Sequence, residues 1–132
     1  MNLLVNIDVA ELAPAEAFYT QAFGLQPARR FGNGAVELLG AQTPIYLLCK
    51  DAGTIGAGTM TRDYARHWTP VHCDVVVTDL ESALSRALSA GASQEGAIRE
   101  ADWGRIVTVA DPFGHGWCLL QFRGRGYDEI AT

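Results

Sequence analysis

The pattern of apolar and polar side chains at the start of the chain predicts a strand that leads directly into a helix. Residues 3–9 are mostly apolar and are interrupted by Asn6 and Asp8, as in a half-buried strand. Apolar side chains then recur at helical spacing between residues 15 and 22, and Gly24 follows as a helix stop signal. The chain therefore begins with a strand and a helix.

Three short runs follow this helix. They span residues 25–31, 35–39 and 45–50, and the segments between them, residues 32–34 and 40–44, contain Gly, Asn and Pro. Gly and Asn tolerate the positive φ angles that tight turns require. The first half is thus predicted to have the order βαβββ.

The second half repeats this order of elements. A strand is predicted at 71–77, a helix at 79–90, and further strands at about 93–99, 104–110 and 116–122. Adding 68 to the position of Glu11, near the first helix start, gives Asp79, near the second. The sequence is therefore a twofold repeat of one βαβββ unit.

Neither half can bury its sheet alone, so we expect the halves to pair. The predicted fold class is α+β: two βαβββ half-repeats form a curved, cup-like mixed sheet with the helices on its convex side. A length of 132 residues suits a single domain. We expect half-repeat 1 over about 1–50, a linker over about 51–68, half-repeat 2 over about 69–123, and a C-terminal tail over 124–132.

Charge and composition narrow the function classes. Ten basic and 15 acidic residues give a net charge of −5, which is unfavourable for binding nucleic acid. The sequence shows no apolar run of about 18 residues, and its first ten residues do not resemble a signal peptide. We therefore expect a cytoplasmic protein with no nucleic-acid or membrane partner.

The three cysteines, Cys49, Cys73 and Cys118, lie in apolar runs. Their number is odd and no pair has C-x-x-C spacing, so they indicate neither a disulfide framework nor a zinc motif of that kind. We interpret them as buried free thiols.

Several short motifs, taken in order, resemble a known superfamily. They are VAEL at 9–12, AFY at 17–19, FGL at 23–25, VTDL at 77–80 and DPFGHGW at 111–117. In this order they resemble the vicinal-oxygen-chelate superfamily of glyoxalase I, bleomycin-resistance proteins and extradiol dioxygenases. The resemblance covers nearly the whole chain and implies the fold predicted above.

The resemblance also implies where a metal would be held. Metal-binding members carry His or Gln and Glu ligands at positions that fall here on Leu4, Tyr46, His72 and Cys118. Only His72 is a standard ligand in its standard place. Because divalent ions need several protein donors, we expect no metal and no cofactor. The alternative is a divalent ion held by His72 and Cys118.

Side-chain alternation predicts the other residues in the concavity. Asn6, Asp8 and Asp74 should face the same way as Leu4 and His72. Asp8 and Asp74 are expected at corresponding places in the two halves, where they would favour a cationic or amine-bearing ligand. Alternatively, both are solvent-exposed at the rim of the cup.

Two tryptophans are further candidates for ligand binding. Trp68, in the linker, would either stack on a planar ligand at the mouth of the cup or pack the linker down. Trp103, at a turn, is either a rim aromatic or a hairpin packing residue. We keep both in the candidate ligand site.

His72 is the best catalytic candidate, since imidazole titrates near neutral pH. His72 acts either as a general base or as a hydrogen-bond donor to the ligand. Alternatively, it has only a structural role, with its hydrogen bonds made to a neighbour such as Asp8 or to water. The leading hypothesis is a homodimeric, metal-independent protein that binds a cationic or aromatic small molecule, similar to antibiotic-sequestering members of the superfamily. The alternative is a lyase, isomerase or dioxygenase of the same superfamily that uses a metal or His72.

Overall fold

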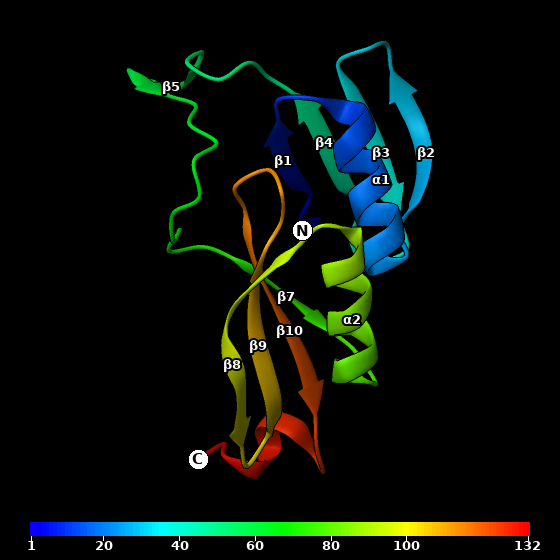
Figure 1. The fold of residues 1–132 in the computed structure, drawn as a ribbon, viewed down its shortest axis with the longest axis vertical. Helices are drawn as coiled ribbons and strands as arrows, with labels where there is room; N and C mark the ends of the chain where they lie inside the picture. The colour runs from blue at the N-terminus through cyan, green and yellow to red at the C-terminus, as the bar shows by residue number, and fades with distance from the viewer. The chain divides into compact units, whose positions relative to one another are not determined.

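The computed structural model describes all residues, Met1–Thr132, and the chain divides into two compact units. These are Met1–Ala65 and Arg66–Thr132. Each unit contains one α-helix and one four-stranded mixed sheet (Figure 1). The predicted α+β class with two βαβββ halves is therefore confirmed, while folding as a single domain stays a prediction.

The first unit has a sheet with the order β1-β4-β3-β2. Only β1 and β4 are parallel, and the other neighbours are antiparallel. The elements are β1 (Val5–Val9), α1 (Leu12–Phe23), β2 (Gln26–Phe31), β3 (Ala35–Leu39), β4 (Ile45–Cys49), β5 (Ile55–Ala57) and β6 (Met60–Thr61).

Helix α1 covers one face of this sheet. It buries Phe18, Tyr19 and Ala22, which lie at the helical spacing expected from the sequence. Gly24 ends the helix at a φ of 71°, in the left-handed region that favours glycine. The side chains beneath α1 come from alternate positions of the strands and are fully buried: Val9, Val36, Leu38 and Leu47.

The second unit repeats this arrangement, with the sheet order β7-β10-β9-β8. Its one parallel pair is β7 with β10. The elements are β7 (Cys73–Val76), α2 (Leu80–Ala90), β8 (Ser93–Ala101), β9 (Gly104–Ala110), β10 (Gly116–Phe122) and the short 3₁₀-helix η1 (Gly126–Glu129). Leu80 and Ala87 of α2 are buried, as are Val107, Val109 and Leu119 of the sheet.

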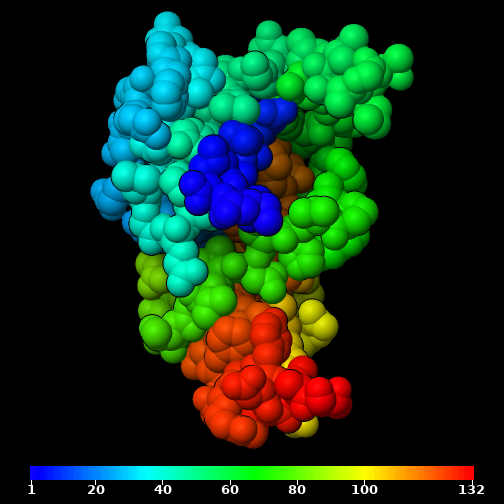
Figure 2. All heavy atoms as spheres, turned by 180° about the vertical axis from the view of Figure 1, so that it is seen from behind, coloured from blue at the N-terminus to red at the C-terminus, as the bar shows by residue number.

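Two segments are more structured than the sequence pattern indicated. The linker forms the hairpin β5–β6, and Arg62 after it donates from Nε to Asp8 Oδ2 at 2.7 Å and from Nη1 to the Ile55 carbonyl at 2.6 Å. The tail contains η1. Figure 2 shows both chain ends at the surface, where Met1 and Ile130 are exposed.

A β-bulge interrupts the edge of the first sheet. Pro27 pairs with Leu38 and Arg30 with Val36, so Ala28 and Arg29 together face Glu37. Bulges of this kind bend a strand and redirect a side chain. The bulge therefore sets the direction of Arg29.

No helix of the structure combines the length and apolar character needed to span a membrane.

Candidate functional site

The face of each sheet turned away from its own helix, here called the helix-free face, carries the polar side chains. Strand register places them in one row per unit. In the first unit the row is Asn6, Tyr46, Glu37 and, across the bulge, Arg29; in the second it is Asp74, Cys118, Thr108 and Glu95.

The second row brings three predicted residues together. His72 immediately precedes β7, Asp74 lies in β7, and Cys118 is its partner in β10. His72 Nε2 is 3.3 Å from Asp74 Oδ1, and one ligand atom from each of the three residues lies within 4.8 Å of the others. The Trp68 ring packs beside the His72 ring at a centroid distance of 4.8 Å.

Cys118 is the least accessible member of this cluster. Its exposed fraction is 3%, and its Sγ lies 3.5 Å from the Thr108 hydroxyl. Burial raises the pKa of the Cys118 thiol, and the neighbouring Asp74 carboxylate acts in the same direction. The thiol is therefore a poor nucleophile at neutral pH.

The outer end of the second row is an ion pair. Arg66 donates to Glu95 from Nε at 3.0 Å and from Nη2 at 2.7 Å. This bond to Arg66 lowers the pKa of Glu95. Arg66, which the linker carries, is thus held by a strand of its own unit.

In the first unit, Leu4 and Asn6 offer little chemistry, and Asp8 is neutralised. Leu4 immediately precedes β1 and is 53% exposed. Asp8 forms an ion pair with Arg62. The expectation that Asp8 corresponds to Asp74 is wrong, because Asn6 pairs with Tyr46 of β4 as Asp74 pairs with Cys118 of β10. Asn6 and Asp74 each lie five positions before the N-cap of the helix that follows.

Tyr46 belongs to a network with Glu37 and Arg29. The Tyr46 hydroxyl donates to Glu37 Oε1 at 2.8 Å, and Arg29 Nε donates to Glu37 Oε2 at 2.9 Å. These bonds, with Arg29 first, lower the pKa of Glu37 to about 2, whereas the bond to Glu37 raises the pKa of Tyr46. Glu37 therefore remains a carboxylate although it is only 4% exposed.

Sequence reasoning missed Glu37 and Arg29. The available signal was a single acid within the apolar run 35–39, since a buried carboxylate needs a partner. The adjacent Arg29 and Arg30 of the preceding strand are both candidates for that partner. The pattern could not choose between them, because the bulge decides which one faces Glu37.

The motif at residues 111–117 has a structural role in the second unit. The buried Asp111 carboxylate accepts hydrogen bonds from the Phe113 and His115 amides, each at 2.9 Å, and from Trp117 Nε1 at 3.3 Å. The His115 ring lies 2.9 Å from the same carboxylate. The acid thereby fixes the turn between β9 and β10.

Trp103 packs against the end of the second sheet. Its ring lies 5.4 Å from that of Tyr127 in η1 and 6.5 Å from that of Phe122. These contacts correspond to the hairpin-packing interpretation of Trp103 rather than the rim interpretation.

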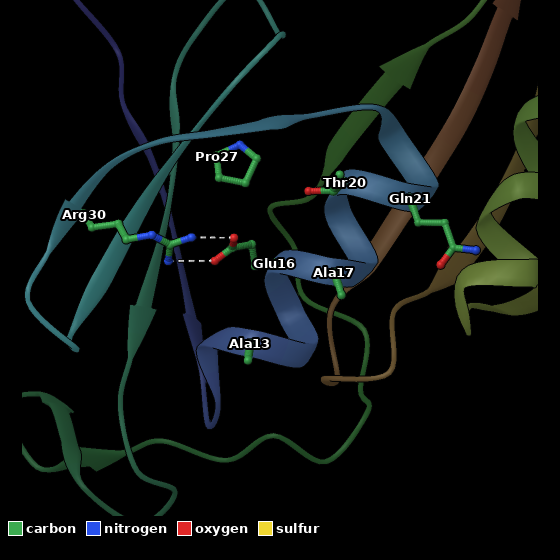
Figure 3. A pocket seen from close by; sticks show the side chains of 7 residues that line it. All are labelled: Ala13, Glu16, Ala17, Thr20, Gln21, Pro27 and Arg30. Carbon is green, nitrogen blue, oxygen red and sulfur yellow. Dashed lines mark hydrogen bonds and ion pairs between the residues drawn. The ribbon is translucent and has the colours of Figure 1, made fainter.

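A hollow of about 520 Å³ lies between α1 and β2 (Figure 3). Small side chains line most of it, and an ion pair from Arg30 to Glu16, at 2.7 Å, crosses it. The buried Thr20 hydroxyl oxygen beside it makes no hydrogen bond. The Arg30 side chain therefore lies on the helix side of the sheet, whereas the Arg29 side chain lies on the helix-free face.

The four positions that the superfamily resemblance assigns to a metal do not fit one in this chain. Leu4 has no donor atom, and the Tyr46 hydroxyl is bound to Glu37. Cys118 is only 3% exposed, and its Sγ contacts the Thr108 hydroxyl. Asp74 adds an oxygen donor beside His72 but lies outside those four positions.

Two βαβββ units are the arrangement of the vicinal-oxygen-chelate class of fold. The family model described as a glyoxalase-like domain matches residues 4–120, so the chain belongs to that family. It is also 34% identical over 133 residues to uncharacterised proteins of Mycobacterium bovis and Mycobacterium tuberculosis. The match covers 96% of this chain and 88% and 78% of those proteins, respectively.

Solved structures share the fold at low identity. The fosfomycin resistance protein FosX of Listeria monocytogenes gives a TM-score of 0.74 at 16% identity, covering 99% of this chain and 98% of that one. A glyoxalase/bleomycin resistance protein/dioxygenase of Nocardioides gives 0.68 at 18%, covering 96% and 85%. Lactoylglutathione lyase of Agrobacterium tumefaciens gives 0.62 at 18%, covering 92% of each chain.

Proposed function

We propose that this glyoxalase-like protein binds a small, antibiotic-like molecule on a helix-free sheet face without a metal ion. The observation that carries the proposal is the Tyr46–Glu37–Arg29 network. Its Tyr46 occupies the position at which, by the superfamily resemblance, a metal-dependent relative would present a carboxylate ligand, and the Tyr46 hydroxyl donates to Glu37.

The surroundings of this network suit binding rather than proton transfer. Arg29 keeps Glu37 ionised with a pKa of about 2, so Glu37 has no proton to give and is a weak base near neutral pH. Aromatic and apolar side chains with a few placed polar groups are typical of ligand sites. Phe31 and Tyr46 supply such rings at a centroid distance of 6.2 Å.

Metal content of the purified protein tests the metal-free part of this proposal. The protein is prepared without affinity metal, and Fe, Mn, Ni, Co, Cu and Zn are quantified by plasma mass spectrometry. We expect less than about one tenth of an equivalent of any metal. Near-stoichiometric metal that is lost in His72→Ala and retained in His67→Ala, a control at an exposed histidine, would overturn it.

Thermal unfolding in the presence of a ligand panel tests the binding part. A molecule that binds only the folded state raises Tm, by an amount that grows with its concentration. The panel contains planar cationic drugs, phenols and aromatic carboxylates, all with EDTA present. An absence of any shift across the panel counts against small-molecule binding.

The second candidate function is metal-dependent or His-based catalysis, as in a lyase, isomerase or dioxygenase. The proximity of His72, Asp74 and Cys118 favours it. The same metal measurement tests the metal-dependent form of this candidate, because only that form predicts a bound ion that depends on His72. Catalysis by His72 without a metal predicts instead a turnover that is lost in His72→Ala.

The proposal also includes a homodimer and a cytoplasmic location. Their support is the superfamily resemblance and the free state of all three cysteines. Light scattering after gel filtration tests the dimer, and fractionation of the source cells tests the location.

A further inference from the structure

The Arg29 guanidinium is held in a fixed orientation, and some of its N–H donors have no acceptor in the protein. Its Nε and Nη2 bind Glu37, and Nη2 also reaches the Tyr46 hydroxyl at 3.1 Å. Nη1 makes no hydrogen bond within the protein. The side chain is nevertheless 67% exposed, so these Nη1 donors face solvent.

The bulge and the buried acid together account for this orientation. Two residues of β2 oppose Glu37, and both oxygens of the Glu37 carboxylate accept from the Arg29 side chain. A guanidinium fixed in this way loses little conformational entropy when it binds an oxyanion. Pairing with the buried Glu37 accounts for the contacts of Nε and Nη2, and it leaves the Nη1 donors of this exposed side chain for recognition.

An aromatic surface adjoins the same guanidinium. The Arg29 Cζ lies 5.8 Å from the centre of the Phe31 ring, and Phe31 is 48% exposed. A ligand oxyanion on Nη1 would therefore have an apolar ring beside it on which its own ring can pack. Both contacts come from the helix-free face of the first unit.

From these contacts we infer that the Arg29–Phe31 surface recognises a small aromatic carboxylate, an inference that rests on the proposed binding function. A monoanion is favoured over a dianion such as a phosphate, because the Glu37 carboxylate lies on the other edge of the same guanidinium. The pairing of Asp8 with Arg62 removes one of the two acids that favoured a cationic ligand.

The test compares four probes that share a phenyl ring: phenylacetate, phenyl phosphate, benzyl alcohol and benzylamine. Each is titrated into ¹⁵N-labelled protein with EDTA present, and binding is followed through backbone amides and the arginine Nε–H signals. Phenylacetate is expected to bind most tightly and to shift the Arg29 Nε–H signal.

The variant is the double substitution Arg29→Gln with Glu37→Gln, which removes both charges and leaves no unpaired buried acid. Its matched control is Arg30→Gln with Glu16→Gln, the neighbouring ion pair on the helix side (Figure 3). Loss of a charge-assisted hydrogen bond should weaken phenylacetate binding about tenfold in the first variant. The control should bind within about twofold of the wild type.

Each outcome decides the inference. Phenylacetate binding that both double variants retain would place the site elsewhere and overturn it. Tighter binding of phenyl phosphate, benzylamine or benzyl alcohol than of phenylacetate would overturn the carboxylate assignment and leave the proposed function standing. If all four probes and the wider thermal panel fail to bind, both proposals fail together.

Discussion

The two units share one architecture but differ in how the acidic side chains on their helix-free faces are paired. In the first unit, both acids are neutralised by arginines, Asp8 by Arg62 and Glu37 by Arg29. In the second, Glu95 is likewise paired with Arg66, but Asp74 lies beside an imidazole and a buried thiol. The helix-facing positions need only apolar side chains of suitable size, so the fold repeats while the other face is free to differ.

Each unit also buries one acid, and the two acids have different roles. Glu37 lies in a strand and orients an exposed arginine, whereas Asp111 lies in a turn and accepts hydrogen bonds from its own loop. The first acid thus belongs to a surface network and the second to the structural framework. Substitutions at the two sites should separate these roles.

The largest expected effect is that of Asp111→Ala. This change removes the carboxylate that accepts hydrogen bonds from the Phe113 and His115 amides and from Trp117 Nε1, and should lower the free energy of unfolding by about 2–4 kcal/mol. Urea unfolding followed by fluorescence measures it. Asp102→Ala, at an exposed turn, is the control and should change stability by less than about 0.5 kcal/mol. If the two substitutions lower the free energy of unfolding equally, the structural role assigned to Asp111 is wrong.

The charge pair of the first unit should give a smaller, pH-dependent effect. The folded-state pKa of Glu37 is about 2, below its ordinary value of 4.5, so the pair contributes stability that is fully present above about pH 4.5. That contribution is lost as the pH falls from 4.5 towards 2. Urea midpoints of the wild type should therefore fall over this window more than those of the Arg29→Gln, Glu37→Gln double variant.

The single variant Arg29→Gln sharpens the same comparison. It leaves the buried Glu37 with Tyr46 as its remaining side-chain partner, so it should be less stable than the double variant at pH 7. The order of their urea midpoints is the measurement. A double variant that is less stable than the single one would show that Glu37 contributes more than its bond to Arg29.

In the second unit, Cys118 should react slowly with thiol reagents. Burial raises its pKa and restricts access, so iodoacetamide at pH 8 should modify Cys118 at least about tenfold more slowly than the half-buried Cys49. Peptide mass spectrometry gives both rates, and unfolding in urea should bring them together. Rapid modification of Cys118 in the folded protein would instead favour the catalytic alternative for this unit.

The sequence predicted the positions that face the helices better than those that face away. Helical spacing at Phe18 and Ala22, and Gly24 as the stop, correctly defined α1, because burial imposes a period on the chain. The Arg29–Glu37 pair depends on a bulge that shifts register by one residue, and no periodicity reports that shift. The proximity of His72 and Cys118 was expected from the resemblance, and alternation placed Asp74 on the same face, whereas its pairing with Cys118 required the strand register.

The smallest expected difference lies at the two helix starts, which the repeat aligns. The Asp79 side chain accepts a hydrogen bond from the Ser82 amide at 3.0 Å, whereas Glu11, at the corresponding position, makes no such bond to α1. Asp79→Ala should therefore lower the free energy of unfolding by about 1 kcal/mol, and Glu11→Ala by no more than a few tenths. Urea unfolding of both variants measures the difference, and Asp79→Asn, which retains an acceptor, should recover most of it. A loss at Glu11 as large as that at Asp79 would mean that the acid at this position of the repeat acts through its charge on the helix N-terminus rather than through a specific hydrogen bond.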